Sequence, residues 1–242
     1  FVRDPAQWTQ LFLVASIVAI AIISVASLPV DTFKGPWMKS WINGLAFLIL
    51  ALVGFVMAAL AARFQFSAVS NEGRSFWVVR TGPLEAMEFL GAKAWPGFLP
   101  MLLIGEGLAV SSTSILQAEP LLIGVAMVTA LGLSFSLSGL AVGMGAMYPD
   151  FKNDNASKLA ASPAGMLYMV AALSLVFLTL ALEAPPVFFL LSEKLRGIPM
   201  TDQRTAIGAA CMAATSVLWI AASIIPMRIG ARRLWNMELP NG

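Results

Sequence analysis

Six long runs of apolar residues dominate this sequence and constrain its fold more than any motif does. At 1.5 Å per residue, a helix needs about 20 residues to cross a bilayer. Of the 242 residues, 59% are hydrophobic and 12% are charged, whereas about a quarter are charged in soluble proteins. The runs cover residues 11–28, 43–62, 97–114, 121–147, 159–182 and 205–227. We therefore predict an all-α integral membrane protein with six transmembrane helices in one domain over residues 1–242.

Residue types that the sequence lacks exclude several kinds of site. There is no His, and the one Cys, Cys211, lies within an apolar run. A haem held by His and a Cys/His metal site are therefore excluded. A disulfide within the chain is excluded as well, because it would need a second Cys. No Gly-rich loop ending in Lys-Ser or Lys-Thr is present, so this chain has no ATP-binding motif of that kind. The net charge of +2 is spread over separate connections, which argues against a nucleic-acid partner.

The longest break in the apolar pattern is the polar stretch 63–95. Apolar runs on both sides place it at the membrane surface. Pro83 is predicted at the first helical position, which Pro favours, and Glu85 in the first turn, where the helix dipole favours an acid. The apolar residues that follow at helical spacing are Leu84, Met87 and Leu90. This pattern predicts a cytoplasmic interfacial helix between spans two and three; a solvated loop is the alternative.

One acidic residue lies in the middle of a predicted span. Glu106 is near the centre of the run 97–114. A charge at that depth costs several kcal/mol unless it is paired or hydrated, so such a residue is a functional candidate. Substrate or proton chemistry and a structural hydrogen bond to a neighbouring helix both stay open. The other predicted spans contain no second acid and no His, so we predict no proton relay.

Two further segments have a distinctive composition. The run 121–147 becomes rich in small residues toward its end, with Ser134, Ser138, Gly139, Gly143 and Gly145. Small residues four apart permit close approach of helices in lipid, so this end predicts packing. The connection 183–204 is too polar to span the bilayer, yet residues 185–191 are strongly apolar. We expect a short re-entrant or surface helix there, between spans five and six.

The Lys and Arg residues are distributed unequally between the two sides of the predicted topology. Ten of the 15 fall in the first, third, fifth and last connections, which include Arg63 and Arg228. Cytoplasmic connections carry an excess of Lys and Arg. This distribution places both ends of the chain and the polar stretch 63–95 in the cytoplasm.

Several short motifs resemble a known family. The most specific is Glu72-Gly73-Arg74-x-Phe76-Trp77, which follows Arg63-Phe64 and precedes Pro83-Leu84. The others are Arg3-Asp4-Pro5 before the first run, Lys93, and Tyr148-Pro149-x-Phe151 with Asn155. Together these motifs resemble the permeases of bacterial ATP-binding cassette exporters of the second type, over most of the chain.

The resemblance implies a permease domain in the bacterial cytoplasmic (inner) membrane that exports a substrate by alternating access. It implies no catalytic residue, metal or cofactor in this chain. ATP and Mg²⁺ would be bound by a separate ATP-binding cassette ATPase subunit. Because family members often hold two membrane halves in one chain, we expect a homodimer or a second permease half. The start at Phe1 also suggests one half of a longer chain.

The resemblance further implies which residues receive movement from the ATPase. The candidates lie in two connections and are Glu72, Arg74, Phe76, Trp77, Glu85, Glu88, Asp150 and Lys152. By analogy, Glu72 and Arg74 would pair with charges on the ATPase. Phe76 and Trp77 would anchor a helix at the lipid surface or fill a groove in the partner. Alternatively, Glu72 and Arg74 pair with each other or with lipid headgroups.

Two other functions stay open on the sequence. A secondary transporter or channel half would use Glu106 as an ion or proton site and would need no ATPase. A membrane assembly subunit would hold a larger complex together and would move nothing. Membrane lipid is an expected partner in every case.

Overall fold

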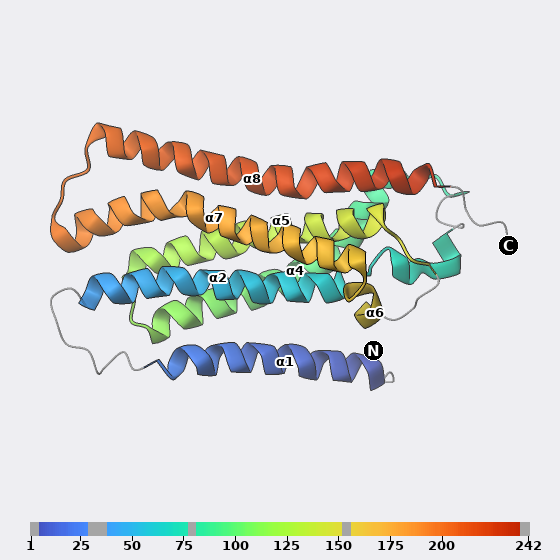
Figure 1. The fold of residues 1–242 in the computed structure, drawn as a ribbon, viewed down its shortest axis with the longest axis horizontal. Helices are drawn as coiled ribbons and strands as arrows, with labels where there is room; N and C mark the ends of the chain where they lie inside the picture. The colour runs from blue at the N-terminus through green and yellow to red at the C-terminus, as the bar shows by residue number, and fades with distance from the viewer. Residues whose placement is uncertain (1–4, 29–37, 77–80, 152–155, 238–242) are drawn as a thin grey trace.

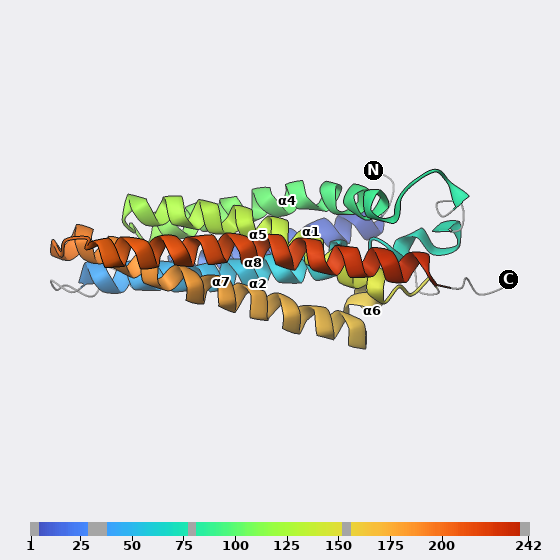
Figure 2. The same cartoon turned by 90° about the horizontal axis from the view of Figure 1, so that it is seen from above.

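The computed structural model describes residues 5–28, 38–76, 81–151 and 156–237. Every regular element within these ranges is a helix. In chain order the helices are α1 (Pro5–Ala26), α2 (Met38–Phe64), the 3₁₀ helix η2 (Ser70–Ser75), α4 (Ala86–Ile115), α5 (Pro120–Met147), α6 (Ala156–Ala160), α7 (Pro163–Arg196) and α8 (Asp202–Trp235). The long helices run side by side as an elongated bundle (Figures 1 and 2).

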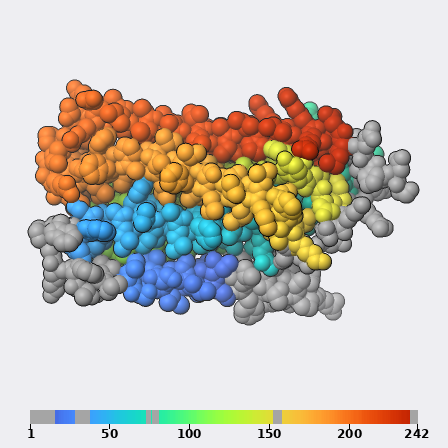
Figure 3. Space-filling view, in the orientation of Figure 1, coloured from blue at the N-terminus to red at the C-terminus, as the bar shows by residue number. Residues whose placement is uncertain are grey.

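Five helices are long and apolar enough to cross a membrane, namely α2, α4, α5, α7 and α8. Their apolar character indicates a multi-pass membrane protein. Beside them, α1 contributes the shorter apolar stretch Ser16–Ala26, so a crossing by the first predicted span stays a prediction. Figure 3 shows α1, α2, α7 and α8 together forming one face of the bundle.

The expected interfacial helix is part of a span. α4 begins at Ala86 and continues to Ile115 through Pro96 and Pro100. The residues assigned to a separate surface helix therefore form the first turns of a membrane-length helix. Prolines are tolerated in such helices because neighbouring segments satisfy or cover the backbone groups that they release.

The expected re-entrant helix over 185–191 is likewise absent as a separate element, because α7 continues through Pro185 and Pro186 to Arg196. It ends at Gly197, whose φ of 65° is the left-handed conformation that Gly adopts easily at the end of a helix. The predicted fifth span, 159–182, is therefore wrong at its end. As a consequence Glu183 lies inside the bundle.

Glycines allow α5 and α8 to approach at their backbones, as the small-residue pattern predicted. Gly139 lies against Ser223, and Gly143 lies against Pro226 and Met227. Gly145 lies against the backbone of Phe66, two residues beyond the end of α2. The predicted packing role is confirmed for these three glycines.

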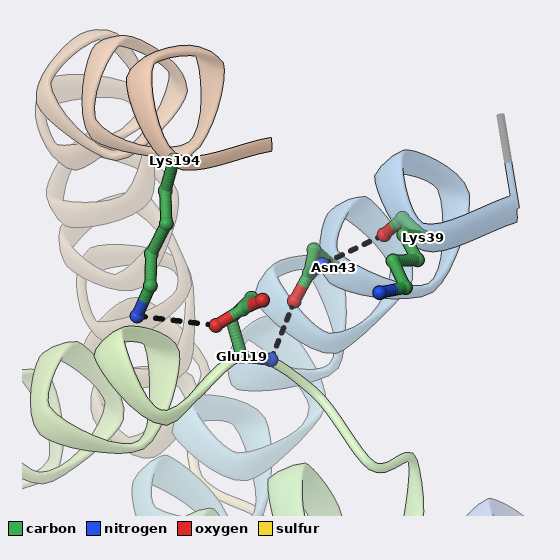
Figure 4. Close-up of polar contacts among 4 residues, drawn as sticks. All are labelled: Lys39, Asn43, Glu119 and Lys194. Atoms are coloured by element: carbon green, nitrogen blue, oxygen red, sulfur yellow. Dashed lines mark hydrogen bonds and ion pairs between the residues drawn. The ribbon is translucent and has the colours of Figure 1, made fainter. Parts of the chain in front are cut away.

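At one end of the bundle, hydrogen bonds join three segments (Figure 4). The Glu119 N–H in the α4–α5 turn donates to Asn43 Oδ1 of α2 at 2.8 Å, and Asn43 Nδ2 donates to Lys39 O at 2.7 Å. Lys194 of α7 lies 3.2 Å from Glu119 Oε2. These contacts hold α2, α7 and the α4–α5 turn together at this end of the bundle.

We expect Gly143→Val to destabilise the protein. A Cβ there would lie 2.5 Å from the Pro226 backbone carbon, and overpacking of this kind costs about 1–3 kcal/mol. Gly124→Val on the same helix is the matched control, because nothing lies within 4 Å of a Cβ there. The free energy of unfolding is measured for both variants in detergent micelles. Equal values would contradict the close contact between α5 and α8 at Gly143.

Candidate functional site

Four connections gather at the other end of the bundle, at the right in Figure 1. They are the start of α1, the α2–α4 connection with η2, the α5–α7 connection with α6, and the end of α8. These are the connections that the Lys and Arg distribution grouped on the more basic side. Their placement in the cytoplasm stays a prediction.

The first part of the polar stretch is packed into the protein. The buried residues here are Gln65, Phe66, Ser67, Val69, Ser70 and Phe76. A solvated loop therefore does not describe this part of the chain. Its burial means that the segment is fixed to the helices around it.

Gln65 fixes the start of this segment to two helices. Its Nε2 donates to Ser138 Oγ of α5 at 2.7 Å and to Ala94 O of α4 at 3.4 Å. Ser138 Oγ also donates to Ala94 O, at 3.2 Å. Gly97 leaves room for the Gln65 side chain. Sequence reasoning missed Gln65, because a polar residue next to the end of a span usually points into water.

An ion pair fixes η2 to α4. Lys93 Nζ pairs with Glu72 Oε1, and the two side chains are 29% and 24% exposed. Glu72 is thus engaged within the chain in this conformation. The side chain of Arg74 and the residues Trp77 and Lys152 lie outside the described part of the structure, so their expected roles stay predictions.

Phe76 lies at the centre of an aromatic cluster and is 1% exposed. Its ring centroid is 5.1 Å from that of Phe151, 5.9 Å from that of Phe89 and 6.1 Å from that of Trp235. The cluster joins η2, α4, the connection after α5 and the end of α8. Phe76 is therefore covered by the chain itself and lies neither at the lipid surface nor in a groove of a partner.

Asp150 joins the two connections that contain the candidate coupling residues. Its N–H donates to Ser70 Oγ at 3.1 Å. The residue is half-buried. This bond places the α5–α6 connection beside η2, so the two connections form one surface.

The acids at the start of α4 remain exposed. Both Glu85 and Glu88 are on the surface, and the Glu85 N–H donates to Glu88 Oε2 at 3.3 Å. This arrangement is the Glu half of a capping box. The adjacent Leu84 is 49% exposed. A negatively charged surface with an apolar edge is thus available to another molecule.

Glu106 lies apart from these residues, in the middle of α4. Along the helix it is about 27 Å from Glu88, at 1.5 Å per residue. It is half-buried, and its Oε2 has no hydrogen-bond partner among the described residues. The structure therefore does not bring Glu106 together with the coupling candidates.

A second membrane acid was missed by the sequence prediction. Glu183 is 1% exposed within α7, although it falls in the predicted polar connection 183–204. The apolar residues 187–191 beyond the two prolines were the signal that the span continues. The prediction that no other span contains an acid is therefore wrong.

We expect Phe76→Ala to destabilise the protein by about 3–5 kcal/mol, because it removes a fully buried aromatic ring. Phe135→Ala is the control, since Phe135 on α5 is 43% exposed. The free energy of unfolding in detergent micelles is measured for both variants and for the unaltered chain. A loss no larger than that of the control would show that the Phe76 cluster does not stabilise the fold.

Comparison with known proteins agrees with this architecture. A family model described as "Putative ATP-binding cassette" matches residues 1–239. No curated protein and no solved structure gives a significant match. The family match and the apolar helices are compatible with a membrane component of a transport system. Since the match covers nearly all of the sequence, the chain belongs to the family described as "Putative ATP-binding cassette".

Proposed function

We propose that this chain is the membrane-spanning permease subunit of an ATP-driven exporter, with ATP hydrolysis supplied by a separate subunit. The family match and the five apolar helices support a transport role in the membrane. The observation that carries the finer proposal is the packed end of the bundle, where the Phe76 cluster joins segments that are distant in the sequence.

This end is suited to passing movement from a partner to the helices. The ion pair of Glu72 with Lys93 connects η2 to α4, and the ring contact of Phe76 with Trp235 connects it to α8. Gln65 connects the same segment to α5. Because closely packed side chains transmit displacement rather than absorb it, a force on η2 would act on three helices together.

The partner surface in this proposal is the exposed acidic start of α4. Glu85 and Glu88 would meet basic side chains on an ATP-binding cassette subunit, and Leu84 would pack against an apolar residue beside them. That subunit would bind ATP and Mg²⁺. Opposite charges across an interface steer association and fix its register.

Transport would proceed by alternating access between two membrane units. One bundle of this size would not enclose a complete pathway, so the proposal includes a homodimer or a second permease half. The direction is export, and the location is the bacterial cytoplasmic membrane with both chain ends on the cytoplasmic side. These finer points rest on the resemblance and on the Lys and Arg distribution.

We expect the double variant Glu85→Gln, Glu88→Gln to bind the ATPase subunit about 2- to 30-fold more weakly. Each exposed charge pair contributes about 0.2–1 kcal/mol, and Gln at position 88 can still accept the capping hydrogen bond. Co-purification from the native membrane, followed by a binding titration with the purified ATPase, measures the effect.

Glu193→Gln with Asp202→Asn is the matched control, because both acids are exposed and lie at the opposite end of the bundle. The control should bind like the unaltered chain. Equal affinities of the two double variants would rule out the acidic surface as the binding site. If no ATP-binding cassette subunit accompanied the unaltered chain, the proposed function itself would be wrong.

A further inference from the structure

The interior of the bundle contains a polar group that the proposed function does not use. Glu183 of α7 and Thr129 of α5 are each 1% exposed, and Thr129 Oγ1 lies 2.8 Å from Glu183 Oε2. About one turn earlier on α7, Trp219 Nε1 of α8 donates to Thr179 Oγ1 at 3.1 Å. A carboxyl group is therefore enclosed where α5, α7 and α8 pack together.

The hydrogen bonds around Thr129 require one more hydrogen than an ionised Glu183 provides. Thr129 Oγ1 lies 2.9 Å from Val125 O as well as 2.8 Å from Glu183 Oε2. A hydroxyl has a single hydrogen to donate, whereas a carbonyl oxygen and a carboxylate are acceptors and have none to donate. With an ionised Glu183, two acceptors would therefore compete for that hydrogen.

A proton on Glu183 Oε2 satisfies both contacts. The carboxyl O–H then donates to Thr129 Oγ1, and the Thr129 hydroxyl donates to Val125 O. The second bond is the usual one for Thr inside a helix, to the carbonyl four residues earlier. Protonation of the carboxyl group thus makes each of the two short distances a separate, complete hydrogen bond.

The other carboxyl oxygen leads to the same conclusion. Glu183 Oε1 is buried and has no hydrogen-bond partner among the described residues. An unpaired carboxylate oxygen in an apolar interior is far more costly than the carbonyl oxygen of a neutral acid. The neutral form is therefore favoured at this position.

No described cation compensates a negative charge on Glu183. α5 contains no titratable residue. The nearest lysines on α2 and α7 on this half of the bundle lie toward its end: Lys39 is exposed, and Lys194, eleven residues beyond Glu183, pairs with Glu119.

On α8, which also packs against α7, the groups on the same half are Asp202, Arg204 and Cys211. Asp202 is exposed, and Cys211 is half-buried. The guanidinium group of Arg204 lies over the Phe189 ring, 5.7 Å from its centroid. None of them forms an ion pair or a hydrogen bond with Glu183 in the described part of the chain.

We propose that Glu183 is a proton-binding site: it holds one proton in this conformation and releases that proton when α5 and α7 separate and water reaches the carboxyl group. Binding converts the carboxylate and one proton to a carboxylic acid, and no other bond changes. This proposal does not depend on the ATPase partner, so it can fail or succeed independently of the proposed function.

The first test is infrared spectroscopy of the whole chain in lipid nanodiscs at neutral pH. We expect the carbonyl stretch of a protonated carboxylic acid, shifted in D₂O, which is lost in Glu183→Gln and kept in Glu193→Gln. Glu106→Gln must also keep this band, because it leaves Glu183 in place. The absence of any such band in Glu106→Gln would overturn the proposal, even if Glu183→Gln did not fold.

The second test is the pH dependence of unfolding in mixed micelles. If Glu183 holds its proton in the folded state, then at a pH where an ordinary Glu of the unfolded chain is ionised the folded state binds one proton more than the unfolded state. The folding equilibrium constant should therefore fall as pH rises, by up to about tenfold per pH unit. Glu183→Gln should remove this slope and Glu193→Gln should retain it.

The same slope of stability against pH in the unaltered chain, in Glu183→Gln and in Glu193→Gln would overturn the proposal. A bound cation that keeps Glu183 ionised would also overturn the proposal. Such a cation would make the stability depend on the choice of Na⁺ or K⁺ at fixed ionic strength.

Discussion

In a bilayer, lipid surrounds apolar side chains nearly as well as protein does, so helices associate through close packing and hydrogen bonds. In this bundle α5 provides both. Gly139 and Gly143 let α8 approach at the backbone, while Ser138 and Thr129 reach polar groups on the segment after α2 and on α7. Because α5 packs against α2, α4, α7 and α8, the positions of the other helices depend on it.

The same requirement explains the end of the bundle where four connections meet. Polar side chains that enter the packed segment find partners within the chain, as Gln65 does with Ser138 and Ser70 does with the N–H of Asp150. Aromatic rings around Phe76 exclude water from the remaining space. The outcome is an end of the bundle whose segments are fixed to one another by buried contacts, while charged side chains such as Glu85, Glu88, Arg228 and Arg232 stay exposed.

Proline is where the sequence prediction and the structure differ most. The predicted boundaries at residues 97 and 182 fall beside Pro96 and the pair Pro185–Pro186, and an interior proline removes a backbone hydrogen bond and disturbs the preceding turn. In α4 and α7 the helix nevertheless continues, since an apolar environment offers the backbone no water to bond with outside a helix. The predicted interfacial and re-entrant helices are thus ends of longer helices, and Glu183 belongs to the bundle interior.

The sequence by itself determined the helical class, the central parts of five apolar helices, the small-residue contact surface of α5 and the grouping of the connections. These features follow from hydrophobicity and spacing over short distances. Only the tertiary structure decided which polar and aromatic side chains are buried and what they contact. Gln65 is 73 residues from Ser138, and Thr129 is 54 residues from Glu183. No local pattern encodes contacts over such separations, because they arise only when packing brings distant helices together.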